Sequence, residues 1–128
     1  METKKTILVV EDEKTLREAV VDILRLKNFN PIEAKNGKEG VEVALKEHPD
    51  LILLDLVMPE MDGMTAFKKI RKDAWGAHVP VIILTNLSDA NQHLVDDVLT
   101  HKPMNYLIKS DWKLLDVVKK VEEVLDMK

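Results

Sequence analysis

The sequence predicts an α/β fold in which helices cover both faces of a parallel sheet. Short apolar runs rich in Val, Ile and Leu alternate with longer segments whose apolar residues recur at helical spacing. Several of the short runs are apolar at almost every position, as expected for strands buried on both faces. Repeated strand–helix alternation requires right-handed crossovers and therefore parallel strands. Because 128 residues suit a single core, we predict one domain over residues 1–128.

The strands are expected at the apolar runs 7–10, 31–34, 51–54, 79–84 and 104–108. The first is wholly apolar and should be central, whereas the second contains Pro31 and Glu33 and is typical of an edge. This predicts the strand order 2-1-3-4-5 of a flavodoxin-like, doubly wound (βα)5 three-layer sandwich.

The helices are expected where apolar residues recur at three- and four-residue steps between and after the strands. The last helix should have its N-cap at Ser110 or Asp111. The apolar positions of the five helices are Leu16, Ala19, Val20, Ile23 and Leu24, then Val41, Ala44 and Leu45, then Phe67 and Ile70, then Leu94, Val95, Val98 and Leu99, and finally Trp112, Leu115, Val118, Val121 and Leu125.

The composition is that of a soluble globular protein, with 45% hydrophobic and 33% charged residues. A net charge of −4 argues against direct nucleic-acid binding, and no apolar run approaches the length needed to cross a membrane. The chain contains no cysteine, so the fold needs no oxidising compartment. We therefore expect a cytoplasmic protein without a membrane or nucleic-acid partner.

Polar residues follow four of the predicted strands. An acidic segment, 11–13, follows the first strand, Asp55 the third, Thr85 the fourth and Lys109 the fifth. Parallel strands end at one edge of the sheet, where ligands of open α/β sheets bind. We therefore expect carboxylates, a hydroxyl and an amine to meet at that edge.

These residue types indicate phosphoryl chemistry with a divalent cation. Carboxylates on adjacent strands repel one another, and Mg²⁺, which prefers oxygen ligands, would remove the repulsion. Thr85 and Lys109 offer a hydroxyl donor and a compact cation for the oxygens of a phosphoryl group. Asp55 is then the natural nucleophile, forming an aspartyl phosphate.

Four motifs in order on the strand ends, "LVVEDE", "LILLDLVMPEMDG", "VIILTN" and "YLIK", make the sequence resemble the receiver domain of two-component response regulators over its whole length. The resemblance implies that Glu11 and Asp12 hold Mg²⁺, or Mn²⁺, together with Asp55 and the backbone carbonyl of Val57. Asp12 is expected to be the more direct ligand.

The resemblance also implies the signalling role. Thr85 and Lys109 would bind the phosphoryl group, and Tyr106 would be the switch aromatic. The donor would be a sensor histidine kinase or phosphotransfer protein. The surface of the fourth helix, fifth strand and fifth helix, about residues 88–128, would signal to a downstream effector protein or a fused output domain. The chain is expected to be a phosphoacceptor and not an enzyme.

Two of the positions that depart from the family pattern lie next to the predicted site. Asn86 stands where Ala or Gly is usual, and its larger side chain is expected to modulate access to the phosphoryl site. Ser110 replaces the usual proline after the lysine, so a cis bond at that point would cost about 3 kcal/mol.

Three other functions are compatible with an acid at the end of a strand in an α/β fold. A phosphatase of the haloacid dehalogenase type needs a second acid two residues after the nucleophile, where this chain has Val57. A nucleotide- or flavin-binding module needs a glycine- or hydroxyl-rich loop after the first strand, where this chain is acidic. A degenerate receiver, acting as a phosphorylation-independent interaction module, stays open. The histidines, at positions 48, 78, 93 and 101, show no ligand spacing and are expected at the surface.

Overall fold

The computed structural model describes residues 4–55, 61, 63–85, 105–108 and 113–125, with Thr85 and residues 105–108 described by their backbone. A parallel sheet forms the middle layer, and its order is β2-β1-β3-β4-β5. The predicted order and the edge position of the second strand are therefore confirmed. The strands are β1 (Thr6–Val10), β2 (Asn30–Ala34), β3 (Leu51–Asp55), β4 (Val81–Thr85) and β5 (Asn105–Ile108).

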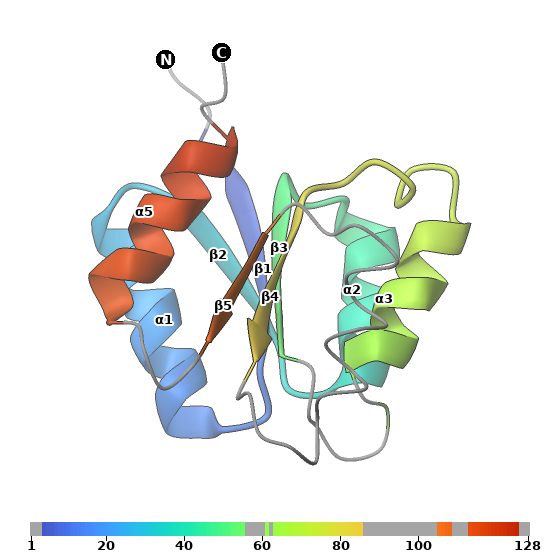
Figure 1. The fold of residues 1–128 in the computed structure, drawn as a ribbon, viewed down its shortest axis with the longest axis horizontal. Helices are drawn as coiled ribbons and strands as arrows, with labels where there is room; N and C mark the ends of the chain where they lie inside the picture. The colour runs from blue at the N-terminus through green and yellow to red at the C-terminus, as the bar shows by residue number, and fades with distance from the viewer. Residues whose placement is uncertain (1–3, 56–60, 62, 86–104, 109–112, 126–128) are drawn as a thin grey trace.

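The described helices cover the two faces of this sheet in pairs (Figure 1). One face carries α1 (Lys14–Leu26) and α5 (Leu114–Leu125), and the other carries α2 (Gly37–Glu47) and α3 (Gly63–Lys72). The helix predicted around residues 94–99 lies outside the described residues. Among the helices that the structure describes, none has the length and apolar character needed to span a bilayer.

Alternate residues of the central strands enter two separate cores. Leu8, Ile52 and Ile83 pack with α2 and α3, whereas Val9 and Leu53 pack with α1 and α5. All five side chains are fully buried. Because each face of the strand is covered by a helix pair, both sets of alternating positions must be apolar. This is why the sequence shows continuous apolar runs instead of an alternating pattern.

The start of α2 packs directly against the chain that follows β3. The Asn36 side chain caps the helix by accepting a hydrogen bond from the Glu39 N–H at 2.8 Å. At Gly37 there is no room for a side chain, because a Cβ would collide with the backbone oxygen of Met61. A Cβ at Gly40 would press on the Val10 side chain at 2.9 Å. These glycines let α2 approach the carboxyl-end edge of the sheet.

The connection from α3 to β4 is held by one arginine. Arg71 donates hydrogen bonds from Nη1 to the carbonyls of Gly76 at 2.8 Å and Val79 at 2.7 Å. Its guanidinium also lies 4.8 Å from the centre of the Phe67 ring. Burial lowers the pKa of Arg71 from its ordinary value. Arginine keeps its charge in proteins, so these are charge-assisted hydrogen bonds.

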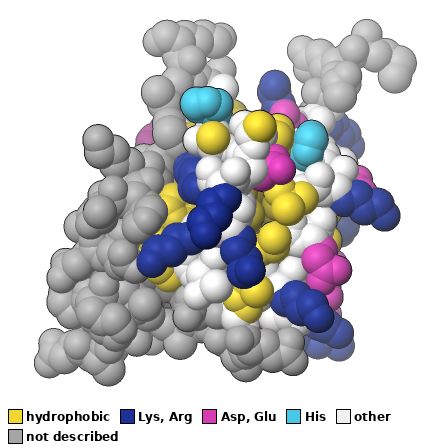
Figure 2. All heavy atoms as spheres, turned by 90° about the vertical axis from the view of Figure 1, so that its right-hand side faces the viewer, with side chains coloured by type: hydrophobic (Ala, Val, Ile, Leu, Met, Phe, Trp, Pro, Cys, Tyr) yellow, Lys and Arg dark blue, Asp and Glu magenta, His cyan; other side chains and the backbone are white. Residues whose placement is uncertain are grey.

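The face formed by α2 and α3 carries Lys and Arg side chains with hydrophobic side chains between them (Figure 2). His48 and His78 are both exposed, as predicted, and the other two histidines lie outside the described residues. His48 has φ 48°, a left-handed conformation, at the C-cap of α2. Its ring stacks on Trp75 with centroids 4.4 Å apart and an interplanar angle of 8°. This stack joins the end of α2 to the connection after α3.

The last helix begins later than predicted. α5 starts at Leu114, whereas the caps proposed from sequence, Ser110 and Asp111, lie outside the described residues. The N–H of Lys113 donates to Asp116 Oδ2 at 2.7 Å, so an acid within the first turn satisfies a backbone donor at this end. From sequence alone, an acid inside the first turn is hard to tell from a cap residue that precedes the helix, so the first helical residue is difficult to predict.

Candidate functional site

The carboxyl ends of the strands lie together at the lower edge of the sheet in Figure 1. Val10 of β1 pairs with Leu54 of β3, so Glu11, the next residue, lies level with Asp55. Asp55 is the last residue of β3 and pairs with Leu84 of β4. Thr85, the last residue of β4, follows on the neighbouring strand. The backbone therefore places these three positions at one edge, as the parallel topology requires.

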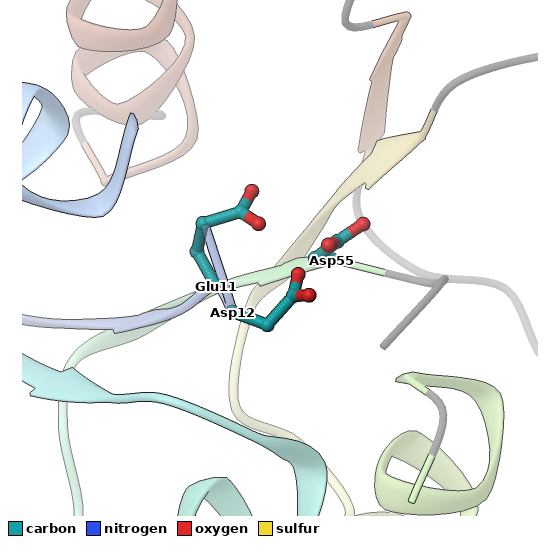
Figure 3. A group of neighbouring side chains, drawn as sticks. All are labelled: Glu11, Asp12 and Asp55. Carbon is teal, nitrogen blue, oxygen red and sulfur yellow. The ribbon is translucent and has the colours of Figure 1, made fainter. Parts of the chain in front are cut away.

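Three acidic side chains converge at this edge (Figure 3). Glu11 is 0% exposed and Asp55 is 2% exposed, whereas Asp12 is exposed. One ligand oxygen from each carboxylate lies within 4.8 Å of the others. Glu11 follows β1 directly and does not belong to a solvated helix start, since α1 has its N-cap at Glu13. Among the residues that the structure describes, this is the acidic cluster able to hold a metal ion.

The cluster concentrates negative charge in a largely buried place. Two unit charges 4.8 Å apart repel by about 3.5 kcal/mol at an effective dielectric constant of about 20. A divalent cation among the oxygens converts this repulsion into attraction. Hard carboxylate oxygens suit Mg²⁺, Mn²⁺ or Ca²⁺ better than they suit zinc or copper. The donor set therefore fits the kind of metal expected from the sequence.

The turn that carries the acids is fixed by contacts that sequence reasoning missed. The Glu11 N–H donates to the Ala34 carbonyl of β2 at 3.1 Å, and the Glu11 carbonyl accepts from Arg17 Nη1 at 2.9 Å. Arg17 Nε in turn donates to Glu33 Oε1 at 3.0 Å. Arg17 comes from α1 and Glu33 from β2, and no local pattern in the sequence links them to the acidic segment.

The remaining predicted residues are placed only in part. Thr85 is the last residue of β4, directly after the predicted strand 79–84, and Tyr106 lies in β5 opposite Ile83, within the predicted strand 104–108. Val57, Asn86 and Lys109 lie outside the described residues. Of the predicted site, the structure thus brings together Glu11, Asp12 and Asp55 by their side chains and adds Thr85 by its backbone.

The chain is similar in sequence to part of an enzyme and to part of a probable transcriptional regulator. Over 120 residues, 93% of the chain, it is 38% identical to the protein-glutamate methylesterase/protein-glutamine glutaminase of Archaeoglobus fulgidus. Over 91 residues it is 36% identical to a probable transcriptional regulator of Porphyridium aerugineum. The chain spans only 34% and 37% of the lengths of these two relatives.

Solved structures show the same fold. The signal receiver domain of a signal transduction histidine kinase from Syntrophus aciditrophicus is 31% identical with a TM-score of 0.85, over 95% of this chain and 90% of that one. The receiver domain of a sensor histidine kinase from Pseudomonas aeruginosa, which has a magnesium ion coordinated in its active site cleft, is 26% identical with a TM-score of 0.84, over 97% and 99% of the two chains.

The family model of the response regulator receiver domain matches residues 7–122, which include β2 to β5, all of β1 except Thr6, and α5 as far as Glu122. The match therefore covers nearly the whole sheet and all of the acidic cluster. This chain belongs to the response regulator receiver domain family.

Proposed function

We propose that this receiver accepts a phosphoryl group on Asp55 from the phosphohistidine of a sensor histidine kinase or phosphotransfer protein, with Mg²⁺ as the metal ion. The observation that carries the proposal is the convergence of Glu11 and Asp12 on Asp55 at the carboxyl end of β3, with ligand oxygens within 4.8 Å. Such a cluster supplies both a nucleophile and a cation site at the edge where α/β sheets bind ligands.

The transfer forms one bond and breaks one bond. A carboxylate oxygen of Asp55 attacks phosphorus, and an O–P bond forms as the N–P bond of the phosphohistidine breaks. The electron pair of that bond leaves with the donor imidazole, which takes up a proton. Asp55 is 2% exposed at the end of a fully buried strand, so its carboxylate would be held in place before the donor arrives.

Glu11, Asp12 and Asp55 would hold Mg²⁺, with the backbone carbonyl of Val57 as a further ligand. When bound, Mg²⁺ would neutralise charge on the carboxylates and on the incoming phosphoryl oxygens. This chain's contribution is to bring the three carboxylates together at one edge of the sheet. The exposed carboxylate of Asp12 gives the site its contact with solvent.

Phosphorylation would then be converted into a change of surface. The added group carries nearly two negative charges and new acceptor oxygens. Thr85 and Lys109 would bind these oxygens, and Tyr106 would turn inward as Thr85 moves. Such a local charge change biases a pre-existing equilibrium between two conformations. The surface of residues 88–128 would present the result to an effector protein or output domain.

Mass spectrometry after incubation with acetyl phosphate and Mg²⁺ tests this function. We expect the wild type to gain the mass of one phosphoryl group, and Asp55→Asn to gain none. Asp22→Asn is a matched control, because Asp22 is an exposed acid on α1 that pairs only with Arg25 at 3.6 Å in the described structure. This control should be labelled like the wild type.

The result also separates the phosphoacceptor from a degenerate receiver. Labelling that needs Mg²⁺ and disappears with Asp55→Asn supports the proposal. A wild type that stays unlabelled over a range of Mg²⁺ concentrations overturns it and favours a phosphorylation-independent interaction module. Labelling that persists in Asp55→Asn places the acceptor on another residue.

A further inference from the structure

We propose that Arg17, held by Glu33, is a positioning residue that sets the affinity of the acidic cluster for its divalent cation. The inference rests on the proposed function, because it concerns the same site. Neither Arg17 nor Glu33 reaches the carboxylates through a described hydrogen bond. Their effect is on the turn between β1 and α1, which carries Glu11 and Asp12.

The peptide groups around Glu11 are held from both sides. Its N–H donates to the Ala34 carbonyl at the end of β2, at 3.1 Å. Its carbonyl accepts from Arg17 Nη1 at 2.9 Å. The carboxylate of Glu11 is fixed as well, since Oε2 accepts the N–H of Glu13 at 3.2 Å. The Glu11 carbonyl belongs to the peptide that leads into Asp12, so the Arg17 contact fixes the residue that presents the exposed carboxylate.

Arginine suits this place because its planar fork can serve two acceptors at once. Nη1 binds the Glu11 carbonyl while Nε binds Glu33 Oε1 at 3.0 Å. The Arg17 side chain is 14% exposed, compared with 46% for Glu33, so the pair is partly shielded from water. Charge-assisted hydrogen bonds in such surroundings are short and directional. A lysine carries its donors on one nitrogen and lacks the planar fork, so it is a poorer match to two separate acceptors.

The restraint matters because the three carboxylates repel one another. Without a cation, like charges with oxygens within 4.8 Å push the turn away from β3. Without the hydrogen bond from Arg17, the turn can move away from β3. Part of the binding free energy of the cation is then used to bring the carboxylates back together, so the affinity falls. Residues that orient metal ligands typically change metal affinity by about ten- to a hundredfold when removed. Arg17 acts on the backbone, so we expect an effect of about tenfold, at the lower end of that range.

Direct titration with Mn²⁺, followed by the electron paramagnetic resonance signal of the free ion, measures the affinity without any turnover. Arg17→Met keeps the length and apolar stem of the side chain and removes the fork. We expect it to bind Mn²⁺ about tenfold more weakly than the wild type, with Arg17→Lys between the two. Arg25→Met is the matched control, since Arg25 lies on the same helix and is 61% exposed. Its affinity should equal that of the wild type.

Labelling by acetyl phosphate separates positioning from a general structural defect. For Arg17→Met the Mg²⁺ concentration that gives half the maximal rate should rise about tenfold, while the rate at saturating Mg²⁺ stays near the wild-type value. Urea unfolding of the same variants reports their stability. Because the cation also favours folding, lost stability raises the half-maximal Mg²⁺ concentration only by the reciprocal of the folded fraction. A variant that urea unfolding shows to be almost fully folded without metal therefore cannot owe a tenfold shift to lost stability.

A double-mutant cycle tests the part played by Glu33. If Glu33 acts only by holding Arg17, the single variant Glu33→Met binds Mn²⁺ more weakly than the wild type. The double variant then binds Mn²⁺ no more weakly than Arg17→Met. Arg17→Met with wild-type Mn²⁺ affinity overturns the inference while leaving the proposed function intact. A wild type that binds neither Mn²⁺ nor Mg²⁺ overturns both. A tenfold loss in Arg17→Met but not in Arg25→Met supports the positioning role.

Discussion

Replacing Asp55 by asparagine should make the metal-free protein more stable. The asparagine side chain has nearly the same shape and keeps one acceptor oxygen, but it carries no charge. Asp55 lies buried beside Glu11, which is also buried, and beside the exposed Asp12. Removing its charge therefore relieves repulsion in the folded state that the unfolded chain does not experience.

The size of the effect follows from the geometry. At 4.8 Å, each pair of charges contributes about 3.5 kcal/mol of repulsion at an effective dielectric constant of about 20. The pair with Asp12 is screened by water, and the loss of any favourable contact of the Asp55 carboxylate offsets part of the gain. We therefore expect the free energy of unfolding in the absence of metal to rise by about 2 kcal/mol.

Urea unfolding, followed by circular dichroism, measures this difference with EDTA and with MgCl₂. A cation that binds only the folded wild type adds about 1.4 kcal/mol at ten times its dissociation constant. The advantage of Asp55→Asn should therefore shrink as Mg²⁺ is added. Asp22→Asn serves as the control, with little change in either condition. If Asp55→Asn is no more stable than the wild type in EDTA, and Mg²⁺ stabilises both equally, the reasoning is refuted.

Three further predictions concern the surroundings of the site. Gly37→Ala should lower stability by about 1 to 3 kcal/mol and slow labelling of Asp55, because its Cβ collides with the Met61 backbone in the segment after β3; unchanged labelling would contradict this. Arg71→Met should cost about 2 to 4 kcal/mol in urea unfolding, since two carbonyls lose a charged donor. Asn86→Ala should speed phosphorylation by acetyl phosphate and loss of the phosphoryl group; unchanged rates for both would refute the idea of restricted access.

The strands were predictable because the physical requirement on them is severe. Leu51 to Leu54 must be apolar on both faces, since one face packs on α1 and α5 and the other on α2 and α3. The predicted first residue of a strand is wrong where a buried apolar residue lies just outside the strand. Val79 is 5% exposed and belongs to the core, yet β4 begins only at Val81. An apolar run therefore marks burial more reliably than it marks the ends of a strand.

The sequence predicted which acids lie together at the edge of the sheet, but not how far each of them is exposed to solvent. Parallel topology alone brings Asp55 level with the residue after β1. The sequence does not distinguish Glu11, which is fully buried, from Asp12, which is exposed. That difference depends on how the turn leaves the strand, and the turn is set by tertiary hydrogen bonds. Periodicity carries no information about such bonds.

Arg17 shows why the supporting residues could not be found in this way. It lies beside the apolar stripe of α1, where a long charged residue is ordinarily solvated, and its partners are six and sixteen residues away along the chain. Reacting groups are confined to the strand ends, whereas a residue that restrains the backbone can come from any element within reach. Two receivers with the same acidic motif can therefore differ in cation affinity through the residues that occupy the places of Arg17 and Glu33.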